Sequence, residues 1–223
     1  MRAVDACYLR AALHPLVSCL CVTEARPDLW PWLWWSFAKQ DYENRELVVV
    51  DSSPVPLVTD DPRVRVVTAA PGTSVAVKRN IALRRAHGSV VAWFDDDDWQ
   101  HPRRLSLLVD ALASGAALAG ATQSWFVQAS DRTARRYHSQ AGVIFNGLAA
   151  TTASIGEVRF DEHKRRAADT PWVRSLTAGA NGTVAVVPEV LSLWLCHRRN
   201  LSNPATKYVF PEALDRVRDI RDA

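Results

Sequence analysis

Short apolar runs alternate with longer helix-like stretches over the first hundred residues. The runs at 16–22, 46–50, 64–67 and 90–94 predict strands, and the unbroken apolar run within the second of them is typical of a parallel strand covered on both faces. Residues 29–39 and 75–86 predict helices, the second of them ended by Gly88, because glycine commonly follows a helix C-terminus. This order of elements predicts an α/β fold with a mixed, mostly parallel central sheet flanked by helices.

The pattern after residue 105 is less regular. Residues 103–114, 169–177 and 212–220 predict helices, and the stretches 116–127, 136–138, 184–187 and 191–195 predict strands. In the tryptophan-rich helix, Trp30, Trp34 and Phe37 recur at helical spacing and are expected to form one buried face. Trp32 and Trp35 fall elsewhere, where a membrane interface, a partner or the core would receive them, and the core is favoured.

Polar residues follow three of the predicted strands directly. Thr23 and Glu24 follow the first strand, Asp51 ends the second, and the run 95–98 (DDDD) follows the strand at 90–94. Ligands of open α/β sheets bind outside the carboxyl ends of the strands, so these groups are expected to converge on one crevice.

Four consecutive aspartates behind a buried strand repel one another. Two like charges ~4 Å apart repel by ~4 kcal/mol at an effective dielectric constant near 20, so a bound cation or protonation must offset the charge. Oxygen ligands of this kind suit Mg²⁺ or Mn²⁺, which typically take one or two carboxylates together with phosphates and water. The alternative is a solvated acidic loop that caps the helix beginning near Pro102.

Composition restricts the class of protein. The net charge is only +3, and the sequence has no dense basic stripe, so no nucleic-acid partner is expected. Four cysteines lack zinc spacing and indicate buried free thiols, with Cys19 and Cys21 on one face of their strand. The chain shows neither a long apolar leader nor a run of ~18–20 apolar residues, so a cytoplasmic protein without a transmembrane segment is expected.

Three motifs in fixed order carry a family resemblance. ELVVVDSS at 46–53, KRNIAL at 78–83 and WFDDDDW at 93–99 resemble the ordered motifs of family 2 glycosyltransferases with the GT-A fold, a Rossmann-like α/β fold. The resemblance is strong over residues 16–105 and weaker to about residue 203. It implies a nucleotide-sugar-binding half at 16–105 and an acceptor-binding half at 106–210 of the same domain. Residues 1–15 are then an N-terminal extension and 211–223 a C-terminal tail.

The resemblance also implies roles for individual residues on the donor side. Asp51 is expected to hydrogen-bond uracil, although Ser52-Ser53 stand where the family often has Asp-Gly. Thr23 and Glu24 would contact base and ribose, and Arg79 would lie near the nucleotide. In the acidic run, Asp95 and Asp96 would contact the nucleotide and Asp97 would bind the metal, with Asp98 as a secondary candidate.

The acceptor side of the resemblance rests on two weaker motifs. FDE at 160–162 followed by ADTPWVR at 168–174 points to Asp169 as the general base, and helix capping is the alternative or additional role of this residue. The segment 193–202 places His197 as a metal or diphosphate ligand, and Arg198 and Arg199 as groups that neutralise the leaving diphosphate.

These expectations define one function and two alternatives. The predicted function is inverting transfer of a single sugar from a nucleotide diphosphate sugar, UDP-linked by preference, to an unidentified acceptor, a natural-product or carrier-bound intermediate being one candidate. A metal-dependent nucleotidyltransferase would need a glycine-rich loop after the first strand, and none follows Val22. A non-catalytic nucleotide-sugar-binding module is the third interpretation. The sequence predicts no oligomeric state.

Overall fold

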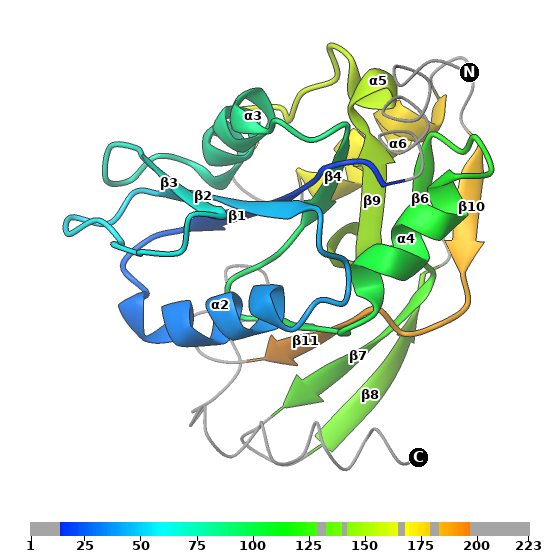
Figure 1. Cartoon of the computed structure of the whole chain (residues 1–223), viewed down its shortest axis with the longest axis horizontal. Coiled ribbons are helices and arrows are strands. Elements are labelled where there is room, and N and C mark those ends of the chain that lie inside the picture. The colour runs from blue at the N-terminus through cyan, green and yellow to red at the C-terminus, as the bar shows by residue number, and fades with distance from the viewer. Residues whose placement is uncertain (1–13, 129–132, 140–141, 165–167, 179–182, 197–223) are drawn as a thin grey trace, which may run out of the picture.

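The computed structural model describes residues 14–128, 133–139, 142–164, 168–178 and 183–196 of the 223-residue chain. These residues form two sheets, with helices packed on both faces of the larger one (Figure 1). The predicted helix at 212–220 and the predicted site residues His197, Arg198 and Arg199 lie outside the described residues.

The central sheet has seven strands among the described residues, in the order β10-β6-β9-β4-β1-β2-β3. Their bounds are β1 (Val17–Thr23), β2 (Arg45–Asp51), β3 (Val64–Thr68), β4 (Val90–Trp93), β6 (Leu118–Ala121), β9 (Leu148–Thr151) and β10 (Val184–Val187). All neighbours are parallel except β9, which is antiparallel to both β4 and β6. The mixed, mostly parallel sheet expected from the sequence is therefore confirmed.

Residues of β1 alternate between two hydrophobic cores. Cys19 and Cys21 point into the core on one face, and Leu20 points into the core on the other. Both cysteines are buried and free, as the sequence predicted. Burial on both faces explains why this strand lacks the polar alternation of a solvent-facing strand.

The helices are divided between the two faces. The 3₁₀ turn η1 (Pro27–Leu29) leads into α2 (Trp30–Ala38), which with α4 (Arg104–Leu112) covers one face. The helices α3 (Val75–Arg85) and α6 (Asp169–Ala178) cover the other face. The turn η2 (Phe145–Gly147) and the short helix α5 (Thr152–Ile155) lie at the two ends of β9.

A second, four-stranded sheet lies beside the first in the order β5-β11-β7-β8. It consists of β5 (Trp99–Gln100), β11 (Ser192–Cys196), β7 (Gln123–Gln128) and β8 (Thr133–His138). One face packs under α2, where Trp32 contacts the cluster formed by Trp99, Val127, Leu193 and Leu195 (Figure 1). The predicted strand region 116–127 is thus two strands, β6 and β7, in different sheets.

The predicted buried face of α2 is found at Phe37 and at Trp30, which packs against the same core, but it is wrong at Trp34. Trp34 is 40% exposed, whereas Trp32 is only 5% exposed. Leu29, Leu33 and Phe37 follow one another at intervals of four residues and pack toward the central sheet, which leaves Trp34 on the outer side. Trp32 is buried against the second sheet, which confirms the core position that was favoured for it from the sequence.

The role expected of Gly88 also needs correction. Helix α3 ends at Arg85, and Ala86 caps it with an extended backbone, so no left-handed glycine ends the helix. A Cβ atom at position 88 would instead lie 2.4 Å from the carbonyl oxygen of Leu16. Glycine is required here because two backbone segments approach closely.

Within the described residues, no helix has the length and apolar character needed to cross a bilayer.

Candidate active site

Two adjoining cavities lie at the carboxyl ends of β1, β2 and β4. The first, of about 500 Å³, is lined by Thr23, Glu24, the four aspartates 95–98, Arg79 and Asp169, among others. The second, of about 390 Å³, is lined by Asp51 and the loop after it, and shares Thr23, Arg26 and Asp96 with the first. The predicted convergence of strand-end groups is found, with Asp51 placed next to the main cavity rather than in it.

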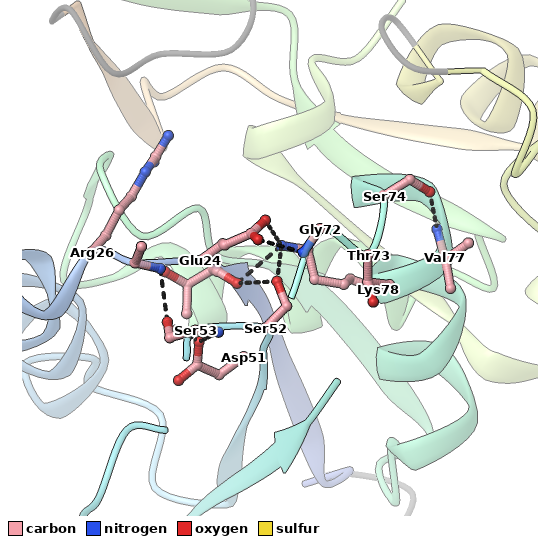
Figure 2. Close-up of polar contacts among 12 residues, drawn as sticks. Glu24, Arg26, Asp51, Ser52, Ser53, Gly72, Thr73, Ser74, Val77 and Lys78 are labelled. Atoms are coloured by element: carbon pink, nitrogen blue, oxygen red, sulfur yellow. Dashed lines mark hydrogen bonds and ion pairs between the residues drawn. The ribbon is translucent and has the colours of Figure 1, made fainter. Parts of the chain in front are cut away.

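Lys78 joins the ends of the first two strands. Its Nζ donates to the carbonyl oxygen of Thr23 at 3.0 Å and to Ser52 Oγ at 2.9 Å, and lies 3.5 Å from Glu24 Oε2. Figure 2 shows the lysine between these groups. Glu24 also accepts from the Gly72 amide at 2.7 Å, and this hydrogen bond, followed by the charge of Lys78, lowers the pKa of Glu24. Burial lowers the pKa of Lys78.

Asp51 shapes the loop that walls the second cavity. Its Oδ1 accepts from the Ser53 amide at 2.9 Å and its Oδ2 from the Leu57 amide at 2.8 Å. Ser53 Oγ in turn donates to Asp51 and accepts from the Ala25 amide at 2.7 Å (Figure 2). Ala25 has a positive φ of 51°, a conformation uncommon for a residue with a side chain. The serine at position 53 therefore ties the first-strand loop to the second-strand loop.

Arg26 binds the acidic run, and the sequence analysis did not identify it. Its Nη1 donates to Asp96 Oδ1 at 2.9 Å and to Asp97 Oδ2 at 3.0 Å. Asp96 also accepts from Thr23 Oγ1 at 2.6 Å. Burial lowers the pKa of Arg26, but the combined charges and hydrogen bonds of the two aspartates outweigh it and raise that pKa. The only sequence signal was indirect: an acidic crevice requires a nearby cation.

Asp98 faces the second sheet. Its Oδ2 accepts from Asn146 Nδ2 at 2.8 Å and its Oδ1 from the Leu195 amide at 3.2 Å. Its carbonyl oxygen accepts from Trp32 Nε1 at 2.9 Å. These contacts connect Asp98 to α2, η2 and β11, and its secondary metal role, considered from the sequence, stays a prediction.

The acidic run shows the electrostatic cost that the sequence predicted. Burial, with added repulsion from Asp97, raises the pKa of Asp96 to about 7, and burial raises the pKa of Asp95 to about 6 despite the nearby Arg79 charge. Burial and the neighbouring carboxylates raise the pKa of Asp98 well above its ordinary value. A cation placed among these oxygens would relieve this cost.

The donor set fits a divalent cation that takes further ligands from its substrate. Asp97 is the predicted ligand and lines the main cavity, where carboxylate oxygens suit Mg²⁺ or Mn²⁺. Across the described parts of the chain, no three histidine, cysteine, aspartate or glutamate side chains gather to hold a metal by themselves. The protein oxygens described here would therefore supply a minority of the ligands, and Arg26 now holds one oxygen of Asp97.

Arg79 connects the acidic run with the candidate base. Its Nη1 donates to Asp169 Oδ1 at 2.7 Å, and its Nη2 lies 3.8 Å from Asp95 Oδ1. The guanidinium lies over the Phe145 ring at 4.3 Å, a cation–π contact that fixes its plane. Asp169 is the first residue of α6 and its side chain is 39% exposed. Its carboxylate thus lines the same cavity as the acidic run and is joined to Asp95 through the Arg79 guanidinium.

Asn80, the next residue along α3, holds the segment before α6. Its Nδ2 donates to the Phe160 carbonyl oxygen at 2.9 Å and to Glu162 Oε1 at 2.8 Å, and its Oδ1 accepts from the Phe160 amide at 2.8 Å. The residues of the KRN segment therefore have separate structural tasks: Lys78 joins strand ends, Arg79 contacts two carboxylates, and Asn80 positions the chain that leads to Asp169.

The chain belongs to glycosyltransferase family 2. The model of that family, described as "Glycosyl transferase family 2", matches residues 31–171, which is more than half of the chain. A comparison with curated proteins gives no match.

Solved structures of low sequence identity share the fold. S. aureus TarS 1–349 in complex with UDP-GlcNAc has a TM-score of 0.66 at 18% identity, and the match covers 90% of this chain and 64% of that one. The same TarS fragment with UDP has a TM-score of 0.64 at 17% identity, covering 82% and 61% of the two chains. Mannosyltransferase PcManGT from Pyrobaculum calidifontis, in complex with GDP-Man and Mn²⁺, has a TM-score of 0.63 at 17% identity, covering 84% and 59%.

These likenesses confirm the GT-A fold expected from the sequence. The chain spans less than two thirds of the length of each of these three structures. Family and fold together define a family 2 glycosyltransferase domain with the GT-A fold.

Proposed function

We propose that the protein transfers a single sugar from a nucleotide diphosphate sugar to an acceptor hydroxyl with inversion at the anomeric carbon. The observation that carries this proposal is the position of Arg79, whose guanidinium contacts both Asp95 of the acidic run and Asp169 at the start of α6 in one cavity. A donor held by the acidic run and an acceptor beside Asp169 would therefore meet in the same space.

The donor occupies the strand ends in this proposal. The nucleobase lies in the second cavity near Asp51. The nucleotide is contacted by Thr23, Glu24, Arg79, Asp95 and Asp96. UDP is the preferred donor nucleotide, which the UDP and UDP-GlcNAc complexes of TarS support, while the GDP-Man complex of PcManGT makes a guanine donor the competing possibility. Residues 16–105 then form the donor half and 106–210 the acceptor half.

A divalent cation, Mg²⁺ or Mn²⁺, would be held by Asp97, with His197 as the second predicted ligand. When bound, such an ion stabilises negative charge that develops on a leaving diphosphate. The complex of PcManGT with Mn²⁺ supports this choice of ion. Arg198 and Arg199 are proposed to add positive charge beside the same diphosphate.

Asp169 acts as the general base. As the acceptor oxygen forms its bond to the anomeric carbon, the bond from that carbon to the diphosphate oxygen breaks, and the acceptor proton passes to Asp169. Attack from the face opposite the leaving group inverts the anomeric configuration in one step. Asp169 lines the cavity and its side chain is 39% exposed, so an acceptor hydroxyl can reach its carboxylate. A cytoplasmic location remains a prediction that accompanies this function.

The test is incubation of the purified protein with UDP-glucose, UDP-GlcNAc or GDP-mannose and Mn²⁺ or Mg²⁺, followed by detection of released nucleoside diphosphate. We expect slow transfer to water in the wild type, since water enters an open cavity. Asp97→Ala and Asp169→Asn are each expected to lower turnover by about 100-fold or more, because one removes a cation ligand and the other the base.

The matched control is Asp60→Asn, which changes an exposed aspartate outside the main cavity. Near-wild-type turnover of Asp169→Asn would refute the base assignment. Release of pyrophosphate instead of nucleoside diphosphate would favour a nucleotidyltransferase. Tight binding of the nucleotide sugar with no turnover would favour the non-catalytic module.

A further inference from the structure

Three aromatic side chains gather on one face of the second sheet. The aromatic triad consists of Phe126 on β7, Tyr137 on β8 and Trp194 on β11. The ring centroids of Phe126 and Trp194 are 4.3 Å apart, those of Tyr137 and Trp194 are 5.2 Å apart, and those of Phe126 and Tyr137 are 5.5 Å apart. Each ring contacts the other two, so the triad forms one continuous aromatic surface.

Strand register explains why the three rings share a face. Phe126 is the direct partner of Trp194, and Tyr137 is the partner of Ser124, two residues before Phe126. Side chains at cross-strand partners and at positions two apart point to the same side of a sheet. The opposite side carries Leu193 and Leu195, which are buried in the core cluster under α2.

The triad is not part of that core. Phe126 and Trp194 are half-buried, and Tyr137 is 37% exposed. Phe126 and Trp194 line the main cavity together with Asp97 and Asp169. An aromatic wall therefore faces the same space as the candidate metal ligand and the candidate base.

We propose that the aromatic triad binds the acceptor, and that the acceptor presents its hydroxyl on a ring whose apolar face stacks on Phe126 and Trp194. The ring is either a sugar, which has a face of C–H groups, or a planar aromatic group, and both have the same stacking chemistry. The inference rests on the proposed glycosyl transfer and names the substrate class of that site.

Stacking suits this reaction because it fixes a ring without using its hydroxyl groups. A ring held by its face keeps its edge free, so one hydroxyl can approach Asp169 while the others remain hydrated. A site built from charged groups alone would bind the acceptor by the hydroxyls that must react.

The experiment uses three small probes on the full chain: methyl β-D-glucopyranoside for a sugar ring, 4-nitrophenol for an aromatic ring, and glycerol as a polyol without a ring. Saturation-transfer NMR, in a buffer that contains UDP and Mg²⁺ but no Mn²⁺, reports which probe contacts the protein. Titration of that probe gives its dissociation constant. We expect at least one ring probe to bind at a concentration where glycerol gives no signal. The ring probe that binds identifies the source of the ring.

Variants then locate the binding site. Trp194→Ala is expected to raise the dissociation constant of the bound ring probe by about tenfold, in line with the loss of one aromatic stacking partner. Tyr137→Ala, at a more exposed position, is expected to raise the same dissociation constant by about threefold. This second variant provides the test if Trp194→Ala does not fold. Trp34→Ala is the control, because Trp34 is an exposed tryptophan outside the main cavity.

Equal signals from glycerol and from the ring probes would overturn the inference, as would an equal effect of Trp34→Ala and Trp194→Ala. A larger dissociation constant for UDP in Trp194→Ala would also overturn the inference, because the triad would then contact the donor. The proposed function fails separately, if the wild type neither binds a nucleotide sugar nor hydrolyses one. Donor hydrolysis without discrimination among the probes would reject only the aromatic acceptor site.

Discussion

Arg26 occupies a position that a divalent cation would contest. Its guanidinium is within 3.0 Å of oxygens on both Asp96 and Asp97, and burial raises the pKa values of Asp95 and Asp96 in the same cluster. One arginine can offset one charge, whereas a divalent ion offsets two and can also bind a diphosphate. We therefore expect Arg26 and the proposed cation to compete for Asp97, with the arginine offsetting part of the carboxylate charge in the absence of the ion.

This competition predicts that Arg26→Ala binds Mn²⁺ more tightly than the wild type. Removal of a charge that would lie beside the bound ion lowers the electrostatic repulsion by about 1–2 kcal/mol at the high effective dielectric of a partly open site, which is about a tenfold decrease in the dissociation constant. Electron paramagnetic resonance of free Mn²⁺ during a titration measures this constant without any turnover.

Arg63→Ala provides the comparison, because Arg63 pairs with Asp61 outside the main cavity. We expect its Mn²⁺ affinity to equal that of the wild type. An unchanged or weaker affinity in Arg26→Ala would show that the arginine does not compete with the ion at Asp97.

At the scale of elements, α2 decides how the two sheets are joined. Trp32 stacks on Trp35 with ring centroids 5.5 Å apart and donates to the carbonyl oxygen of Asp98. The same ring packs against Trp99, Leu193 and Leu195 of the second sheet. A helix that packs on the central sheet by one face and on the second sheet by another fixes the acidic run between them.

Two substitutions in α2 separate these faces. Trp32→Ala is expected to lower the free energy of unfolding by about 3–5 kcal/mol, since it removes a buried aromatic side chain and leaves a cavity. Trp34→Ala should lower it by less than about 1 kcal/mol, because this ring is 40% exposed and its Nε1 hydrogen bond to Asp61 is at the surface. Urea denaturation followed by circular dichroism measures both, and similar losses would contradict the assignment of the buried face.

Prediction from the sequence succeeded where one pattern determined one element. The strands β1, β2 and β4 are mostly apolar and mostly buried, which leaves a clear signal, and β3 is a shorter, partly buried run of valines around Arg65. The strand β9 was missed because Leu148–Thr151 is short and alanine-rich, and its place between β4 and β6 depends on contacts distant in sequence. The prediction that Trp34 lies on the buried face of α2 was wrong because tryptophan appears on every side of this helix, so hydrophobicity alone cannot orient it.

The same distinction applies to the candidate site. Residues directly after strands, such as Thr23 and Asp97, were identified because topology brings strand ends together. Arg26 was missed because no motif marks a single arginine in a loop. Phe126 and Trp194 were missed because their place in the cavity depends on the pairing of β7 with β11, which are about 65 residues apart along the chain.

At the scale of the whole molecule, α3 joins the donor side to the acceptor side. Arg79 reaches Asp169 at the start of α6, and Asn80 makes three hydrogen bonds to Phe160 and Glu162. Asn80 is 2% exposed, and its amide group replaces the backbone partners that an irregular buried segment would otherwise lack. We therefore expect the position of Asp169, the proposed base, to depend on a residue that need not touch either substrate.

Asn80→Ala tests this dependence through stability and turnover together. The substitution leaves the amide and the carbonyl oxygen of Phe160 without their partner, which should lower the free energy of unfolding by about 2–4 kcal/mol. Donor hydrolysis should fall by up to about 100-fold, because a shift of ~1 Å in a reacting group costs that much. Asn44→Ala is the control, since its hydrogen bond to the His14 carbonyl oxygen is exposed. If Asn80→Ala lost stability but kept full donor hydrolysis, the segment before α6 would hold the fold without positioning Asp169.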